Sequence, residues 1–481
     1  MTMQAAERME PPQNEQPRPR WRGGWALVKE ALAGGEQDFT AGSLPRAVFL
    51  LSIPMILEMS MESVFGLLDA LFVGRLGADA VAAVGVTESL LTLVFTVALG
   101  LSMSTTAMVA RRIGEGDEDG AAVAAVQAIA LGVIVSVPVA VAGILYGGRL
   151  LALMGAPASV AEGGQGYAAW ILGGSSTILL LFLVNAIFRG AGDASLAMRS
   201  LWVANVVNIV LDPCLIFGLG PFPEMGLVGA AIGTTVGRAV GVCYQIRALW
   251  KADGRIAVRR KHLRLDAPVM LRLVRLSLGG ILQFFIATAS WVALVRILTP
   301  FGSAALAGYT IALRIIVVAI LPAWGMSNAA ATLVGQNLGA GKPDRAERSV
   351  WLTGFYNMAF LAAVAVVFIV FAESLIGLFS PDPGVRAVGA TCLRVVSYGY
   401  VSYAWGMVMV QAFNGAGDTT TPTWINLVCY WMFQIPLAWT LARTLAMGPT
   451  GVFLAITIAE SLVTVVSIVF FRRGRWKTQR V

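Results

Sequence analysis

The chain alternates long apolar segments with short polar connections. Spanning a bilayer takes about 20 apolar residues in a helix, and twelve of these segments are long enough. They cover residues 48–74, 80–110, 121–147, 164–188, 197–217, 227–250, 270–297, 304–334, 348–377, 387–412, 422–443 and 450–471. The pattern predicts an all-α integral membrane protein with 12 transmembrane helices. An even number of crossings places both termini on one side.

The second half of the chain repeats the first at an offset of 225 residues, as FRGAGD at 188–193 and FNGAGD at 413–418 illustrate. After the fifth helix the offset falls to 222, where Gly229 aligns with Gly451. Six helices precede the second copy, so both copies enter the membrane in the same sense. This predicts two parallel-repeat six-helix bundles related by a pseudo-twofold axis along the membrane normal.

The repeat also predicts the domain organisation. We expect an N-terminal tail over 1–42, an N-lobe over 43–250, a linker over 251–275, a C-lobe over 276–471 and a basic tail over 472–481. Within the N-terminal tail, the apolar residues Trp21, Trp25, Val28 and Leu32 recur at helical spacing, which predicts an interfacial helix lying on the membrane.

Composition and charge agree with a membrane protein and set its orientation. The chain is 57% hydrophobic and 13% charged, against about 25% charged in soluble domains. Its net charge of +8 comes from Lys and Arg that gather at the ends of apolar segments, mostly in connections on the side of the termini. By the positive-inside rule this side is cytoplasmic, so we expect a multi-pass protein of the inner (plasma) membrane with both termini in the cytoplasm. The distribution does not suit nucleic-acid binding.

Two glycine-rich loops invite a nucleotide-binding interpretation that their sequence does not support. Neither GAGD loop is followed by Lys-Ser or Lys-Thr, and no strand precedes either one. As turns between helices, they use glycine at positive φ, and Asp193 or Asp418 can cap the next helix. We therefore expect no nucleotide, and transport would depend on an ion gradient. No set of nucleophile, base and orienting group suggests an enzyme.

The first predicted helix carries three carboxylates on one stripe. At about 100° per residue, Glu62 lies about 40° and Asp69 about 20° from Glu58 around the helix axis. A charge at the bilayer centre costs at least ~2.5–3.5 kcal/mol on insertion scales, so the stripe is not expected to face lipid. It predicts a water-accessible cavity that handles cations or protons. The alternative for Glu58 is a place near the membrane surface, where it caps the helix or is solvated.

The fifth predicted helix supplies another intramembrane carboxylate with amide neighbours. Asn208 and Asp212 lie four residues apart on one face, and Asn205 is one turn earlier. Helix 6 adds Thr234, and helix 4 ends with Asn185. Such oxygen ligands suit a hard cation such as Na⁺ or a proton relay. For each amide or hydroxyl alone, the alternative is an interhelical hydrogen bond.

The repeat indicates which of these residues the fold itself requires. The positions equivalent to Glu58, Glu62, Asp69, Asn208 and Asp212 hold Gln283, Ala287, Leu294, Phe433 and Leu437. The fold is thus duplicated without these carboxylates, which predicts an ion site in the N-lobe. Glu88 also has an apolar counterpart and is assigned to the same cavity or its mouth. No arginine is expected beside Asp69 or Asp212 in this bundle.

Together these features resemble the multidrug and toxic compound extrusion (MATE) family, over about residues 43–475. The resemblance rests on the duplicated bundle, LDALFVGRLG in helix 1, GQNLGAGKPDRAE after helix 8, both GAGD loops and NIVLDP in helix 5. Members are antiporters that export amphipathic, often cationic drugs in exchange for Na⁺ or H⁺. The prokaryotic branch implies an N-lobe cation site at Asp69, Asn208, Asp212 and Thr234. The C-lobe carboxylates of another branch are not matched, which puts a second cation site in doubt.

We therefore expect a multidrug efflux transporter that works by alternating access, with no cofactor beyond its coupling ion, H⁺ or Na⁺. Loss of that ion charges the N-lobe site and attracts a lipophilic cation; ion re-entry at Asp69 and Asp212 bends helix 1 and expels it. Candidates for a substrate or proton cavity are Glu58, Glu62, Glu88, Asn185 and Asn205. Candidates for an apolar wall are Met59, Met61, Phe65, Phe284, Phe285 and Trp291. Expected partners are amphipathic or cationic small molecules and membrane lipid, and the expected state is a monomer.

Two other classes of membrane protein remain open at this stage. A lipid-linked precursor flippase of the same superfamily would require a basic groove for pyrophosphate, whereas the distinguishing charges of the first bundle are acidic. A receptor or channel is disfavoured by the repeat with an internal pair of carboxylates.

Overall fold

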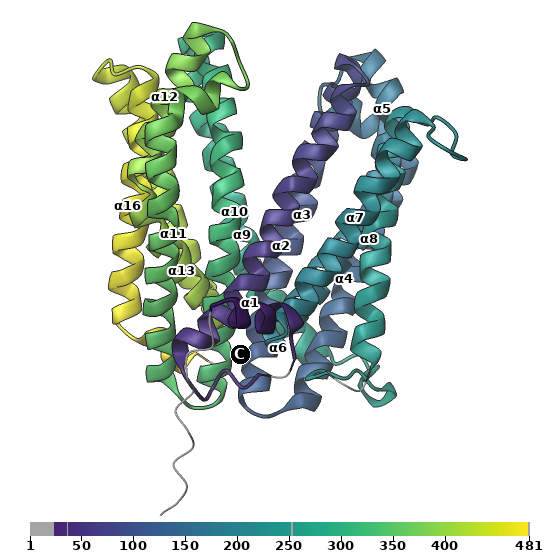
Figure 1. The fold of residues 1–481 in the computed structure, drawn as a ribbon, viewed down its shortest axis with the longest axis vertical. Coiled ribbons are helices and arrows are strands. Elements are labelled where there is room, and N and C mark those ends of the chain that lie inside the picture. Colours follow the sequence, from purple (N-terminus) through teal and green to yellow (C-terminus); the bar gives the residue numbers. More distant parts are fainter. Residues whose placement is uncertain (1–23, 36, 252–253, 480–481) are drawn as a thin grey trace, which may run out of the picture.

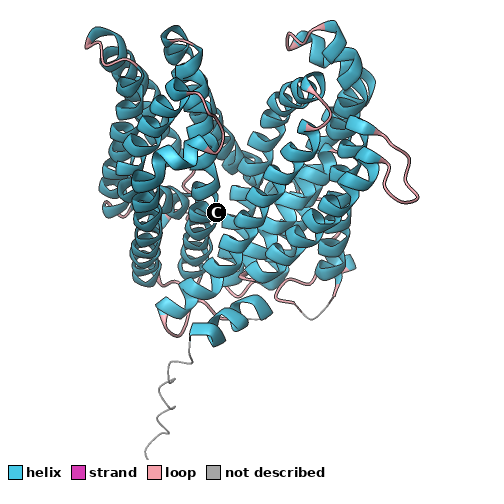
Figure 2. Cartoon of the chain, turned by 45° about the horizontal axis from the view of Figure 1, so that its top comes forward, coloured by secondary structure: helices cyan, strands magenta, loops and turns pink. Residues whose placement is uncertain are grey.

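A computed structural model describes residues 24–35, 37–251 and 254–479, and every regular element within them is a helix (Figures 1 and 2). Most of the predicted N-terminal tail, including Trp21, lies outside the described residues. The interfacial helix predicted there corresponds in its described part to α1 (Gly24–Ala33), on which Trp25 is exposed.

The predicted spans correspond to helices in both lobes. The N-lobe contains α2 (Leu44–Gly74), α3 (Ala78–Gly114), α4 (Glu118–Leu153), α5 (Ala158–Gly173), α6 (Ser175–Ala191), α7 (Ala194–Phe217) and α8 (Gly226–Trp250). The C-lobe contains α9 (Ala267–Leu298), α10 (Ser303–Gly339), α11 (Pro343–Gly377), α12 (Pro383–Tyr398), α13 (Tyr400–Gly415), α14 (Thr420–Asn426), η3 (Leu427–Gln434), α15 (Ile435–Trp439), η4 (Thr440–Thr444) and α16 (Pro449–Arg472). Short turns are η1 (Arg260–His262), η2 (Thr299–Phe301) and η5 (Arg475–Thr478).

The twelve predicted membrane segments are confirmed, although two of them are built from more than one helix. In the described residues, 11 helical segments are long and apolar enough to span a membrane, with α5 and α6 counted as one. The pair α12 and α13 is the twelfth. The segment from α14 to η4 is continuous, and η3 and η4 within it are π-helical.

The fourth membrane segment of each lobe is interrupted at the same place in the repeat. Gly174 separates α5 from α6, and Gly399 separates α12 from α13, 225 residues later. A Cβ atom at Gly174 would lie 2.7 Å from Cγ2 of Thr235, and one at Gly399 would lie 2.9 Å from Cγ2 of Thr457. Each glycine therefore lets the fourth segment approach the sixth.

The two lobes meet at the end of the molecule that carries α1 and diverge toward the opposite end (Figure 1). At the junction, α3 packs on α9 and α10 packs on α2. A Cβ atom at Gly100 would lie 2.6 Å from the backbone nitrogen of Ile281, and one at Gly325 would lie 2.8 Å from the carbonyl carbon of Met55. The 225-residue offset relates these two contacts, so glycine permits close backbone approach on both sides of the pseudo-twofold axis.

The segment that contains α1 links the lobes at this end. Arg199 of α7 donates hydrogen bonds to the carbonyl oxygens of Leu32 and Ala33, at 2.5 and 2.6 Å. From the other lobe, Arg345 of α11 donates to the carbonyl oxygens of Ala41 and Gly42, at 2.6 and 2.9 Å. The described N-terminal residues therefore hold the two lobes together where the basic side chains gather.

The structure begins α9 inside the predicted linker of 251–275. Asp266 caps α9, because its Oδ1 accepts a hydrogen bond of 3.1 Å from the backbone nitrogen of Val269. Arg272 and Arg275 consequently belong to the first turns of a helix rather than to a loop. The two predicted caps of the GAGD loops are confirmed, with Asp193 capping α7 and Asp418 accepting from the backbone of Thr421.

Candidate functional site

A cluster of oxygen-bearing side chains joins α7 to α8 inside the N-lobe. Asn208 donates from Nδ2 to Oδ1 of Asp212 at 3.0 Å and to Oγ1 of Thr234 at 3.1 Å. All three side chains are buried. The helical spacing of Asn208 and Asp212 places both on the face that meets α8. Gly233 makes the approach possible, because a Cβ atom there would lie 2.2 Å from Oδ1 of Asp212.

This cluster has acceptor atoms to spare. Oδ2 of Asp212 and Oδ1 of Asn208 are buried and have no hydrogen-bond partner in the described structure. A buried acceptor without a partner is costly, so a native structure that retains two side by side calls for an explanation. A hard cation or a proton at these oxygens would satisfy them, and the donor types fit both.

Asp69 approaches the cluster from α2. It lies within electrostatic range of Asp212, and in the described residues no hydrogen bond joins its carboxylate to another group. Tyr167 of α5, a buried residue that sequence patterns do not single out, lies within the range of both carboxylates. The structure thus brings the four predicted cation-site residues into one region.

The expectation that no arginine lies beside these carboxylates is wrong. Arg238 of α8 is within electrostatic range of Asp69. Its guanidinium carbon lies 6.0 Å from the ring centroid of Phe65 and 5.9 Å from that of Phe95, a cation–π arrangement between α2 and α3. An arginine at the middle of an apolar helix is a sequence signal that points to an acidic partner.

Glu58 lies neither at the membrane surface nor in open space. Its side chain is 1% exposed, and its Oε1 accepts hydrogen bonds of 2.9 Å from Arg189 and from Asn185 of α6. Asn185 in turn accepts from Gln245 of α8 at 2.6 Å. Glu58 and Asn185, predicted as cavity residues, therefore belong to a closed interhelical network.

The C-lobe reproduces this contact with neutral groups. Gln283 and Asn414 occupy the positions equivalent to Glu58 and Arg189, and Nε2 of Gln283 donates to Oδ1 of Asn414 at 3.1 Å. The same two helical positions thus meet in both lobes, once as an ion pair and once as an amide pair. We infer that the Glu58 and Arg189 pair holds helices together.

The other predicted cavity residues lie along the face of the N-lobe that carries Asp69. Asn205 donates from Nδ2 to Oε2 of Glu62 at 3.2 Å, which joins α7 to α2. Glu88 is exposed on α3 and lies within electrostatic range of Arg314 on α10, so these two charges face each other from opposite lobes.

Comparison with known proteins decides the family. A family model described as MatE matches residues 54–214 and 280–440, which together are most of the chain. The chain belongs to the MATE family. Its two matched stretches coincide with the two copies of the repeat.

Relatives of this MATE protein match it over nearly their whole length. A protein named probable multidrug resistance protein NorM of Thermotoga maritima is 24% identical over 431 residues, which cover 90% of this chain and 93% of that protein. A protein named FAD transporter of Shewanella oneidensis is 25% identical over 420 residues, which cover 87% of this chain and 92% of that protein.

A solved structure shares the arrangement of the lobes. It is described as the outward-facing conformation of a multidrug resistance MATE family transporter of the MOP superfamily. It superposes with a TM-score of 0.85 at 26% identity and covers 92% of this chain and 98% of that chain. This MATE protein is accordingly a multi-pass membrane transporter.

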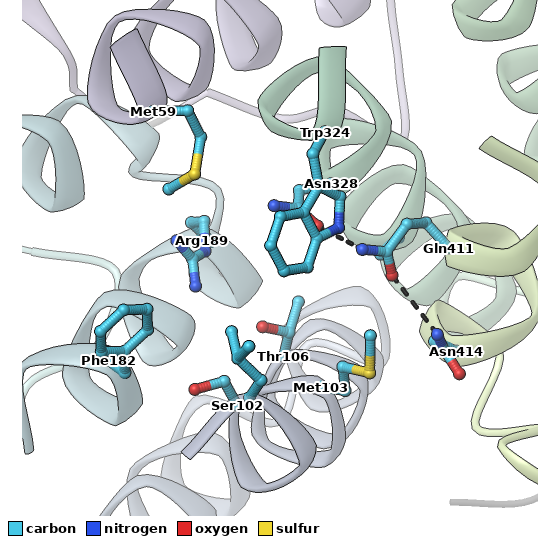
Figure 3. A pocket seen from close by; sticks show the side chains of 12 residues that line it. Met59, Ser102, Met103, Thr106, Phe182, Arg189, Trp324, Asn328, Gln411 and Asn414 are labelled. Carbon is cyan, nitrogen blue, oxygen red and sulfur yellow. Dashed lines mark hydrogen bonds between the residues drawn. The ribbon is translucent and has the colours of Figure 1, made fainter. Parts of the chain in front are cut away.

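The lobes of this MATE protein enclose a pocket where they meet. Arg189 and Phe182 line it from the N-lobe, and Trp324, Gln411 and Asn414 line it from the C-lobe (Figure 3). Its space is about 590 Å³. On the C-lobe side the wall is a chain of amides, since Gln411 donates to Asn328 at 2.6 Å and accepts from Asn414 at 3.4 Å. Met59, predicted as part of an apolar wall, lines the N-lobe side.

A second cavity opens within the C-lobe. It holds about 1200 Å³ of space and shares Met103, Trp324 and Gln411 with the pocket between the lobes. Phe284 and Trp291 line it, whereas Phe285 is exposed and does not. The C-lobe also carries a carboxylate that sequence patterns do not single out, Glu460 of α16, and this residue lines the cavity.

Proposed function

We propose that this MATE protein is a multidrug efflux transporter that exports amphipathic, often cationic small molecules in exchange for H⁺ or Na⁺. The observation that carries the proposal is the buried Asn208, Asp212 and Thr234 cluster, with two unpartnered oxygens, beside Asp69. Such a site gains a cation or proton readily and is neutralised by it. The names of the relatives support export of several drugs.

In this proposal the basic α1 end of the molecule is cytoplasmic, and the lobes diverge toward the outside. An ion from the outside reaches Asp69 and Asp212 in the outward-open state. Its binding removes the negative charge that attracts a cationic substrate and changes the packing of α2 against α7, so the substrate is released outward. The lobes then rock about their junction to face the cytoplasm. We propose a monomer in the plasma membrane.

Ion-driven efflux from proteoliposomes tests this proposal. The measurement is the initial rate of ethidium efflux under an imposed pH gradient or an imposed Na⁺ gradient. We expect one gradient to drive efflux, and Asp69→Asn and Asp212→Asn to abolish a coupling of about 5- to 150-fold, the usual range for linked sites. Asp79→Asn removes an exposed carboxylate of α3 and serves as the matched control, with an unchanged rate. Gradient-driven efflux that persists at full rate in both site variants would sink the proposal.

The flippase alternative finds less support in the linings of the two pockets. Arg189 is the one basic side chain among the described residues that line them, and it is paired with Glu58. A pyrophosphate group would need several unpaired cations there. Movement of a labelled lipid-linked pyrophosphate in the same proteoliposomes, without ion-driven movement of ethidium, would favour the flippase.

A further inference from the structure

The C-lobe cavity contains an acidic group placed deep within the membrane segment. Glu460 follows Pro449, the first residue of α16, by 11 positions, which is about 17 Å along a helix about 36 Å long. Carboxylates at this depth are rare and costly, and they usually serve binding or ion translocation.

The immediate partner of Glu460 is a tyrosine rather than a cation. The hydroxyl of Tyr430 lies 3.2 Å from both carboxylate oxygens, and it is the one hydrogen-bond partner of Glu460 in the described residues. No described Lys, Arg or His lies within ion-pair distance of the carboxylate. Tyr430 belongs to η3, and π-helical geometry of this kind is rare and recurs at functional sites. A hydroxyl steadies a carboxylate without neutralising its charge.

Aromatic side chains surround this carboxylate. Trp291 and Tyr403 line the cavity beside Glu460, and Phe284 and Trp324 line it farther on. Glu460 also lines a neighbouring cavity together with Trp291 and Tyr403, so it is reached from two sides. Aromatic faces attract organic cations, and an apolar cavity with one fixed polar group is the usual form of a small-molecule site.

The repeat shows that the sign of this charge distinguishes the two lobes. Under the offset of 222 residues that relates the sixth helices, Glu460 is equivalent to Arg238 of the N-lobe. The N-lobe thus places a cation at this position, among the acidic residues Asp69 and Glu88. The C-lobe places an anion there, among aromatic rings. The two cavities therefore differ in what they can bind.

We propose that the C-lobe cavity binds the cationic group of an amphipathic organic substrate, with Glu460 as its counter-charge and Trp291 and Tyr403 as its aromatic wall. The inference rests on the proposed function, because it names where the exported cation is held. Continuity with the pocket between the lobes, through Met103, Trp324 and Gln411, gives the substrate a route toward the open end. The coupling ion and the organic cation then occupy different lobes.

Equilibrium binding to the full-length protein in nanodiscs tests this assignment. The probe is radiolabelled tetraphenylphosphonium, with the neutral triphenylphosphine oxide as a matched compound. We expect Glu460→Gln to weaken tetraphenylphosphonium binding by about tenfold or more, about 1.4 kcal/mol, and to leave the neutral compound unaffected. Glu460→Asp, which keeps the charge, is expected to restore most of the affinity. Trp291→Leu is expected to weaken both compounds.

The outcomes separate this inference from the proposed function. Unchanged tetraphenylphosphonium affinity in Glu460→Gln would overturn the C-lobe site while leaving ion-driven efflux and its dependence on Asp69 untouched. Equal weakening of charged and neutral compounds would also overturn it, because it would show a loss of cavity shape. If ethidium efflux by the unaltered protein responds to neither gradient, the proposed function itself fails, whatever Glu460→Gln does.

Discussion

The two lobes share one six-helix plan, and they differ in the charges placed on it. The backbone features repeat closely: both fourth segments break at a glycine, and both lobe junctions bring a glycine against the partner helix. At equivalent side-chain positions, Asp69 and Asp212 face Leu294 and Leu437 of the C-lobe. The fold can therefore be built without these two carboxylates, and their presence requires a reason other than packing.

The comparison also separates structural charges from functional ones. Glu58 and Arg189 form an ion pair where the C-lobe forms an amide pair of Gln283 and Asn414. A contact that both lobes make in the same place, with or without charge, belongs to the fold. Asp69 and Asp212 make no contact that the C-lobe reproduces.

The largest effect is expected from giving the N-lobe the residues of the C-lobe. In Asp69→Leu with Asp212→Leu, both positions carry the side chain that the repeat accepts elsewhere. We expect the protein to fold, because leucine fits the equivalent helices, and the ion dependence of substrate binding to be lost, about 5- to 150-fold. Tetraphenylphosphonium affinity measured across a range of pH and Na⁺ concentration checks this. Retained ion dependence would place the ion site elsewhere.

A change of several kcal/mol is expected from breaking the Glu58 pair. Glu58→Gln leaves the Arg189 guanidinium buried without its carboxylate, which costs about 3–5 kcal/mol. The double variant Glu58→Gln with Arg189→Asn copies the Gln283 and Asn414 pair and is expected to recover most of that loss. Thermal unfolding of the purified proteins measures both. A double variant no more stable than Glu58→Gln would show that the lobes do not share this contact.

Intermediate and equal effects are expected at the two helix breaks. Gly174→Ala and Gly399→Ala each force a methyl group against a threonine of the sixth segment, Thr235 or Thr457. Overpacking of this kind costs about 1–3 kcal/mol. Thermal unfolding should show similar losses in the two variants. A loss in one lobe alone would mean that the break is not an equivalent feature of the repeat.

The smallest effects are expected at the caps of the GAGD loops. Asp193→Ala and Asp418→Ala each remove the acceptor for a backbone N–H at the start of a helix, worth about 0.5–2 kcal/mol. The two losses should again be alike, and transport should persist in both variants. Loss of ethidium efflux at normal protein stability would contradict a purely structural role.

The sequence predicts most of the fold and the core of the ion site. Apolar length alone locates the twelve membrane segments, because the bilayer imposes it. The spacing of Asn208 and Asp212 places them on one helix face, and the repeat marks them as dispensable for packing. The breaks at Gly174 and Gly399 escape prediction, since the apolar runs continue through them and the break depends on how closely the sixth segment packs.

Partners of the charged residues depend on tertiary contacts that a helix pattern does not contain. Arg189 lies at the end of α6, as a solvated or lipid-facing arginine would, yet it turns inward to Glu58. Arg238 and Glu460 are visible as charges in apolar helices. Their equivalence emerges only when the shorter offset of 222 is carried through the sixth helices.

The claim that substrate and coupling ion exchange through the N-lobe carboxylates is tested most directly by ion release on substrate binding. Tetraphenylphosphonium is added to the purified protein in weakly buffered solution while released protons and displaced ²²Na⁺ are measured. We predict release of one of the two ions by the unaltered protein and none by Asp69→Asn with Asp212→Asn. Tetraphenylphosphonium binding without release of either ion, or undiminished release from the double variant, would contradict an exchange at Asp69 and Asp212.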